Sequence, residues 1–233
     1  MSLRGYYSDL ALAAQGLKEW GEHQPGVQVL ALVAAGSLEH LPLLQAECKG
    51  IEVAGAVFPE LISDGQFMPK GALLVTLPAG SRFFLRSSTT AEADAEALEE
   101  YFAPHLNPQG GDGLFLIPDA TVRHGSSLLA ELHLRLSDSV NYAGAGAGSA
   151  SFEPGKHLFH RDRCHENGIL AILVPGMPSP LLHHGFRVGS EDRIATAAEG
   201  NRVVRIDWKP VFEVYQDMVQ AQYGHEVTRD NFF

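Results

Sequence analysis

Residues 141–151 read Asn-Tyr-Ala-Gly-Ala-Gly-Ala-Gly-Ser-Ala-Ser, a run of small side chains after Tyr142. The glycines that alternate with alanine in this run are Gly144, Gly146 and Gly148. Because glycine lacks a Cβ, another backbone or a ligand can approach such a main chain closely. The segment is therefore interpreted either as a ligand-binding surface of backbone N–H groups, to which Ser149 adds a hydroxyl, or as a closely packed central strand.

The glycine run does not match the two common nucleotide-binding motifs. A dinucleotide fingerprint needs Gly-x-Gly-x-x-Gly at the start of a helix. Counting from either of the first two glycines places a serine at the last position, and Pro154 argues against a helix. A Walker loop needs a glycine five residues before its Gly-Lys pair, and Ala150 holds that place before Gly155-Lys156. Neither motif is present, so a phosphate-binding loop of either kind is not expected here.

The glycine run belongs to one of two similar halves of the chain. Each half has an apolar strand, a helix, a strand containing Ala-Gly-Ala, and a strand that begins with glycine and ends before proline. The matching segments are 29–35, 53–56 and 71–78 in the first half and 113–117, 142–145 and 168–175 in the second. Tandem strand–helix–strand–strand repeats over residues 27–88 and 113–176 predict an α/β fold with mixed sheets flanked by helices and a pseudo-twofold axis.

Composition and charge exclude several classes of function. The chain of 233 residues has a formal net charge of −11, which weighs against binding to nucleic acids or anionic membranes. An acidic run at Glu92–Glu100 is interpreted as a solvated helix face. Only two cysteines are present, and neither a secretory signal nor a long apolar segment is visible. These features predict a cytoplasmic protein.

Four potential metal ligands occur close together as His157, His160, Cys164 and His165. Imidazole and thiolate groups are typical ligands of zinc and other transition metals. Two side chains separated by three positions on a strand point to opposite faces, however, so a compact site requires a bend. A hairpin over 157–167 without a bound metal is the preferred interpretation.

A second candidate site lies between a predicted strand that ends near Pro118 and the helix that follows it. Its polar residues are Asp119, Arg123, His124 and Ser126. Ligands of open α/β sheets bind at the carboxyl ends of strands, and helix N-termini favour anions. We expect Arg123 to pair with a carboxylate and Asp119 with an ammonium group, an arrangement that suits an amino acid. The alternative is that Ser126 caps the helix and Arg123 is solvated.

Several motifs in sequence order resemble the FIST N-terminal domain. They are Tyr142-Ala-Gly, Gly168-Ile-Leu-Ala-Ile-Leu-Val-Pro-Gly, His184-Gly-Phe-x-x-Gly, and the segment Ala198-Glu-Gly-Asn-x-Val through Tyr215. Phe186 and Trp208 depart from the residues usual in that family. The resemblance implies an α/β domain over 1–208, closed by a hairpin. Residues 209–233 are expected to form a helix followed by a segment that resembles the beginning of a truncated FIST C-terminal domain.

The resemblance also implies the function. FIST domains are proposed sensory modules of intracellular signal transduction, so we expect a non-enzymatic domain that binds a small polar ligand, such as an amino acid, without a cofactor. Its expected partner is a FIST C-terminal domain or another signalling protein. Two alternatives stay open: a metal-dependent enzyme that uses the 157–165 cluster, and an interaction module without a ligand.

Overall fold

The computed structural model describes residues 4–47, 50–151, 153–181, 192–199 and 202–231. These residues form two compact units, 1–181 and 182–233, which are described separately. The hairpin expected to close the larger domain and the C-terminal helix both fall within the second unit. The sequence of residues 181–188 also predicts a strand, and all of these residues except Leu181 lie outside the described part of the chain.

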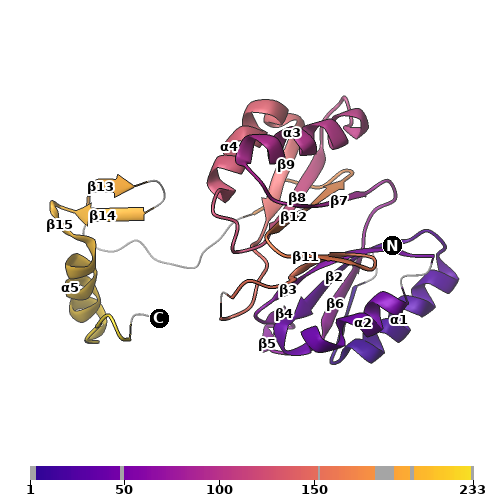
Figure 1. The fold of residues 1–233 in the computed structure, drawn as a ribbon, viewed down its shortest axis with the longest axis horizontal. Helices are drawn as coiled ribbons and strands as arrows, with labels where there is room; N and C mark the ends of the chain where they lie inside the picture. The colour runs from indigo at the N-terminus through magenta and orange to yellow at the C-terminus, as the bar shows by residue number, and fades with distance from the viewer. Residues whose placement is uncertain (1–3, 48–49, 152, 182–191, 200–201, 232–233) are drawn as a thin grey trace. The chain divides into compact units, whose positions relative to one another are not determined.

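The first unit contains two mixed β-sheets and their flanking helices (Figure 1). Its elements, with η for 3-10 helices, are β1 (Arg4–Tyr7), α1 (Leu10–His23), β2 (Gln28–Ala34), η1 (Ala35–His40), α2 (Leu41–Ala46), β3 (Glu52–Phe58), β4 (Leu61–Ser63), β5 (Gln66–Met68), β6 (Ala72–Thr76), β7 (Arg82–Ser87), α3 (Ala91–Phe102), η2 (Ala103–His105), β8 (Asp112–Pro118), α4 (Gly125–Leu136), η3 (Ser137–Ser139), β9 (Val140–Gly144), β10 (Leu158–His160), β11 (Arg163–His165) and β12 (Gly168–Val174). The expected fold class, α/β with mixed sheets flanked by helices, is confirmed.

The central strands of the two sheets pair in the same way. The first sheet has the order β1-β6-β2-β3-β10-β11, and the second has the order β7-β12-β8-β9. In each, one parallel pair, β2 with β3 or β8 with β9, is flanked by an antiparallel neighbour, β6 or β12. The pseudo-twofold relation itself stays a prediction. One boundary differs from the expected repeats: β7 lies in 27–88 but pairs with β12 of the second sheet.

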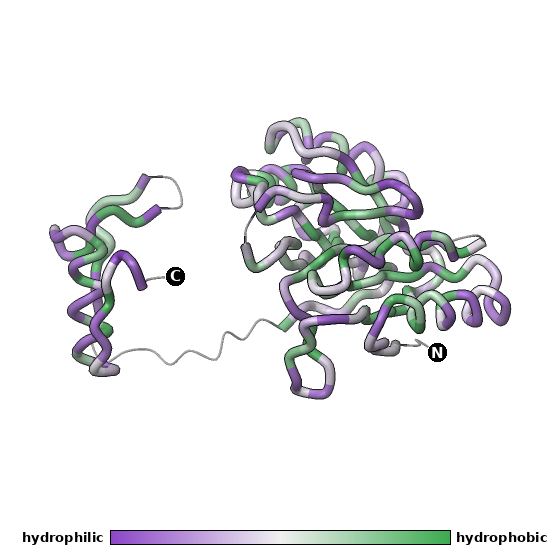
Figure 2. The backbone as a smooth tube through the Cα atoms, turned by 60° about the horizontal axis from the view of Figure 1, so that its bottom comes forward, coloured by the Kyte–Doolittle hydropathy of each residue, from purple (hydrophilic) through white to green (hydrophobic). Residues whose placement is uncertain are grey.

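The sheets stack with their helices on the outside. One apolar cluster joins α1 and α2 to the first sheet through Leu17, Leu44 and Val53, and a second cluster joins α3 and α4 to the second sheet. A third cluster contains side chains of both sheets, such as Leu30 and Ile172. Figure 2 shows hydrophobic colour concentrated in the strands of this unit, whereas hydrophobic and hydrophilic colours alternate along its helices. Because strand side chains alternate between faces, strands buried on both faces are nearly continuously apolar.

Local capping residues account for where α1 and α3 begin. Asp9 accepts a hydrogen bond from the Leu12 N–H and caps α1. Thr90 caps α3, because its hydroxyl oxygen accepts a hydrogen bond from the Ala93 N–H. In α4 no side chain caps the helix, and Ser126 is its second residue. The alternative in which Ser126 caps the helix is therefore wrong, because the helix begins at Gly125 and already includes Ser126.

Close approach between neighbouring strands explains the glycine of each Ala-Gly-Ala segment. Gly55 of β3 lies opposite Ala31 of β2, and Gly144 of β9 lies opposite Leu116 of β8. A Cβ would lie 2.0 Å from the Ala31 carbonyl oxygen at Gly55 and 1.9 Å from the Leu116 carbonyl oxygen at Gly144. Real Cβ atoms do not approach oxygen this closely, so each site requires glycine.

The second unit is a small sheet with one helix. Its described elements are β13 (Ala195–Glu199), β14 (Arg202–Ile206), β15 (Lys209–Pro210) and α5 (Val211–Tyr223), and the three strands pair in that order. Gly224, in the left-handed conformation with φ of 68°, ends α5. Within this unit Trp208 and Tyr223 remain largely exposed.

Candidate functional site

A cleft of about 420 Å³ lies at the edge of the second sheet where β7 and β8 end. The start of β12 reaches the same edge, since Gly168 pairs with Ser87 and Ile169 pairs with Pro118. The residues that line the cleft are Thr89, Thr121, Arg123, His124, Pro154, Glu166 and Asn167. They come from the loops that follow β7, β8 and β9 and from the residues before β12. This is the edge at which ligands of α/β sheets commonly bind.

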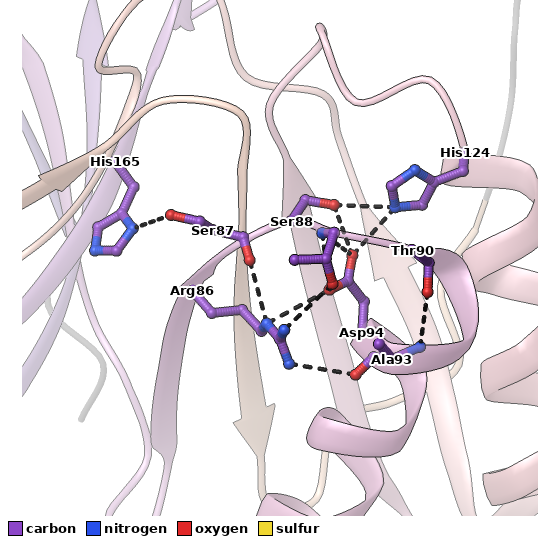
Figure 3. A network of polar contacts seen from close by, with 9 residues as sticks. Arg86, Ser87, Ser88, Thr90, Ala93, Asp94, His124 and His165 are labelled. Carbon is purple, nitrogen blue, oxygen red and sulfur yellow. Dashed lines mark hydrogen bonds and ion pairs between the residues drawn. The ribbon is translucent and has the colours of Figure 1, made fainter.

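A buried carboxylate organises one wall of this cleft (Figure 3). The side chain of Asp94, in the first turn of α3, has no exposed surface. Its oxygens accept from the Ser88 hydroxyl at 2.6 Å and from the Thr89 N–H at 3.2 Å, and they lie 3.1 Å from Nε2 of His124. The Arg86 guanidinium adds an ion pair with an Nε–Oδ1 distance of 3.4 Å. The network therefore ties the loop after β7 to the residue that precedes α4.

The hydrogen bonds of this network keep Asp94 ionised. Burial raises the pKa of its carboxyl, but the Ser88 hydroxyl, His124, the Thr89 N–H and the charge of Arg86 together outweigh burial and hold the pKa below its ordinary value. A buried carboxylate that accepts this many hydrogen bonds is rigid as well as charged. Asp94 thus acts as a fixed anchor behind the cleft, at whose surface His124 and Thr89 lie.

Two of the predicted site residues, Arg123 and His124, line the cleft together. The Arg123 side chain is exposed and makes no hydrogen bond or ion pair within the described residues. Ser126 is exposed next to them in the first turn of α4 but does not line the cleft. Because no side chain caps α4, its first N–H groups add a partial positive charge beside Arg123.

Asp119 is placed differently from the expectation. Its side chain is buried, with one oxygen accepting from the Thr121 N–H at 2.9 Å and the Thr121 hydroxyl at 2.6 Å. Its other oxygen lies 3.1 Å from Nδ1 of His157, which is also buried. A ligand ammonium group cannot reach this carboxylate without rearrangement, because both oxygens are engaged inside the protein. Asp119 instead links the end of β8 to the residue that precedes β10.

The glycine run lies at the edge of the second sheet and changes character along its length. Gly144 and Gly146 are exposed, and a Cβ at Gly146 would meet nothing within 4 Å. Gly148 is buried, and its N–H donates to the Val57 carbonyl at the end of β3. The Ser149 hydroxyl bonds to the Ser151 hydroxyl. The run is thus neither a central strand nor a wall of the cleft, whose lining includes none of these residues.

The hairpin expected over 157–167 is present as β10 and β11, but it separates the four potential metal ligands. His157 contacts Asp119, and Nε2 of His160 lies 3.4 Å from a Glu52 oxygen. Cys164 accepts from Gln45, while His165 contacts Ser87. Within the described part of the chain, no group of three or more His, Cys, Asp or Glu side chains is arranged to hold a metal ion. The alternative of a metal-dependent enzyme therefore lacks the ligand set on which it rested.

Sequence reasoning missed the buried Asp94 and the polar lining residues Thr89, Thr121, Glu166 and Asn167. Asp94 was included in the acidic run interpreted as a solvated face, and that interpretation is wrong for this residue, which is buried. A signal was available, because Asp94 lies four positions before Leu98 on the apolar stripe of α3. A buried stripe position occupied by aspartate indicates a partnered carboxylate.

A larger open depression, of about 750 Å³, lies at the edge of the first sheet where β2 begins and β6 ends. It is lined by residues 24–28 and 76–82, among which Arg82 is the charged side chain. Polar side chains there already have protein partners, since Gln28 donates to Glu52 and to the Ser81 carbonyl. We therefore assign the candidate site to the smaller cleft.

Comparisons with known proteins place the chain in a family. The family model described as the FIST N domain matches residues 28–209, which is more than three quarters of the chain. No curated protein sequence matches it. Among the helices of the described residues, none is both long and apolar enough to cross a lipid bilayer. The quoted motifs fall inside the matched range except for the end of the last one, which runs to Tyr215, and the chain therefore belongs to the FIST N domain family, whose members are generally sensory domains of signal transduction.

Proposed function

We propose that this protein is a sensory domain that binds a small polar ligand, an amino acid, in the cleft between the ends of β7 and β8. The observation that carries the proposal is the pairing of opposite charges in one cleft. Arg123 and Glu166 both line it, and neither side chain has a hydrogen bond or ion pair within the described residues. A cleft of about 420 Å³ suits a small metabolite.

Each end of an amino acid has a suitable group in this cleft. A guanidinium binds a carboxylate through two parallel hydrogen bonds, and the uncapped N-terminus of α4 adds favourable N–H dipoles. Glu166 provides the negative charge for an ammonium group, in place of the buried Asp119. The proposal includes no catalysed reaction and no cofactor.

The proposed output is contact with another protein. A ligand that binds one conformation more tightly than another shifts the population between them. The unit of residues 182–233 exposes large apolar side chains, including Trp208 and Tyr223, which are suited to contact with a signalling partner or a FIST C-terminal domain. The same observation favours the second candidate function, an interaction module without a ligand.

A panel of amino acids, measured by thermal unfolding, tests the proposed function. A ligand at a hundredfold excess over its dissociation constant stabilises the folded protein by about 2.7 kcal/mol, which raises the unfolding midpoint by about 5 to 10 °C. Replacing Arg123 by glutamine is expected to weaken binding by about ten- to a hundredfold, because a charge-assisted hydrogen-bond pair is lost.

Arg163→Gln is the matched control, since Arg163 is an exposed arginine of β11 that does not line the cleft. Its shift should equal that of the unmodified protein. A panel without any selective shift would contradict the proposed sensor and favour the interaction module. Equal loss of binding in both variants would place the ligand outside the cleft.

A further inference from the structure

The ring of His124 lines the cleft while one of its nitrogens is held inside the protein. Nε2 lies 3.1 Å from Oδ2 of Asp94 and 3.0 Å from the Ser88 hydroxyl. Figure 3 shows the other ring nitrogen turned away from this network. No hydrogen bond of Nδ1 is present within the described residues, and His124 is part of the cleft wall.

The chemistry of Asp94 determines which nitrogen of His124 carries the proton. An ionised carboxylate can only accept hydrogen bonds, and Asp94 stays ionised because its hydrogen bonds and Arg86 hold its pKa low. The partner at 3.1 Å must therefore donate, so Nε2 is protonated. A neutral imidazole has one N–H, which leaves Nδ1 as a hydrogen-bond acceptor.

We propose that His124 determines ligand specificity, because Asp94 fixes its tautomer so that Nδ1 accepts a hydrogen bond from an N–H or O–H group of the ligand. This inference rests on the proposed function and states which ligands the cleft selects. Charge alone would not distinguish a primary ammonium group from a quaternary one. An acceptor at Nδ1 does, since a quaternary ammonium has no N–H to donate.

The first test needs no ligand. Nitrogen-15 NMR of the imidazole ring distinguishes a protonated from an unprotonated nitrogen, and the His124 signal is assigned by its absence in His124→Phe. At alkaline pH, where the imidazole ring is neutral, Nε2 should be protonated and Nδ1 unprotonated. A proton on Nδ1 under these conditions would overturn the inference.

The second test measures selectivity by calorimetry. N,N-dimethylglycine and N,N,N-trimethylglycine carry the same charges, but only the first has an N–H donor. The dimethyl compound is expected to bind about tenfold more tightly to the unmodified protein. His124→Gln, whose amide can still donate to Asp94 but does not place an acceptor at Nδ1, should bind both equally. His124→Asn, whose side-chain oxygen can occupy the Nδ1 position, should restore part of the preference.

The outcomes separate this inference from the proposed function. If His124→Gln keeps the full preference for the dimethyl compound, the ligand is bound but His124 does not select it. If the unmodified protein binds both compounds equally, the inference is overturned while the sensor remains. If neither these compounds nor any amino acid of the panel binds, both the inference and the proposed function are overturned.

Discussion

Replacing Gly55 by alanine is expected to lower the free energy of unfolding by about 3 kcal/mol, because the added methyl group has no space. A Cβ at this position would lie 2.0 Å from the Ala31 carbonyl oxygen and 2.4 Å from the Phe159 ring, both of which are buried. Gly55 lies in β3 with β2 on one side and β10 on the other, so the strand cannot move away. Urea unfolding of the purified protein measures the loss.

Gly146→Ala is the control for this experiment. Its Cβ would meet nothing within 4 Å, so the free energy of unfolding should stay within about 0.5 kcal/mol or rise slightly. Gly144→Ala should be intermediate: the Leu116 carbonyl oxygen is as close, but β9 is an edge strand that can shift outward. Equal stability of Gly55→Ala and Gly146→Ala would mean that the close approach of β2 and β3 is absent.

Removal of the Asp94 carboxylate is expected to cost about 3 kcal/mol of stability and to loosen the wall of the cleft. Asp94→Ala leaves the Ser88 hydroxyl, the Thr89 N–H and the Arg86 guanidinium without their acceptor, and unpaired groups of this kind are costly to bury. Glu100→Ala, an exposed position on the same helix, should change stability by less than about 0.5 kcal/mol. Equal losses would contradict the assignment of Asp94 as the buried anchor.

Acid should remove the same contribution. The folded protein holds the pKa of Asp94 below the ordinary value of about 3.8, so its carboxylate stabilises the fold fully above that value. The contribution is lost as the pH falls through the lower pKa of the folded state. The stability difference between the unmodified protein and Asp94→Asn should therefore be constant near neutral pH and should shrink below about pH 4.

Local patterns in the sequence predicted which strands and helices form better than they predicted which strands pair with each other. Apolar runs and a capping residue such as Asp9 act within a few positions, and the corresponding strands and helices are present. Pairing between β7 and β12, or between β3 and β10, joins segments far apart in the chain, and no pattern within either strand specifies its partner. The hairpin 157–167 was predicted, but its pairing with the first sheet was not.

The same distinction applies to the candidate site. Arg123 and His124 were predicted because the end of a strand and the start of a helix are recognisable in sequence. The engagement of Asp119 with His157 was not, since 38 positions separate them. Glu166 joins the cleft only because β12 starts beside the end of β7. Such juxtapositions depend on the arrangement of the strands and not on local composition.

Titration of the nitrogen-15-labelled protein with the best-binding amino acid, followed through its backbone amide signals, tests the ligand cleft most directly. The account predicts saturable shifts at Thr89, Thr121, Arg123 and Asn167, with the signals of Gly26 and Gly80 in the larger depression unchanged. Arg123→Gln should move the same shifts to ligand concentrations about ten- to a hundredfold higher. Shifts confined to residues 24–28 and 76–82 would contradict the assignment and place the ligand in the larger depression.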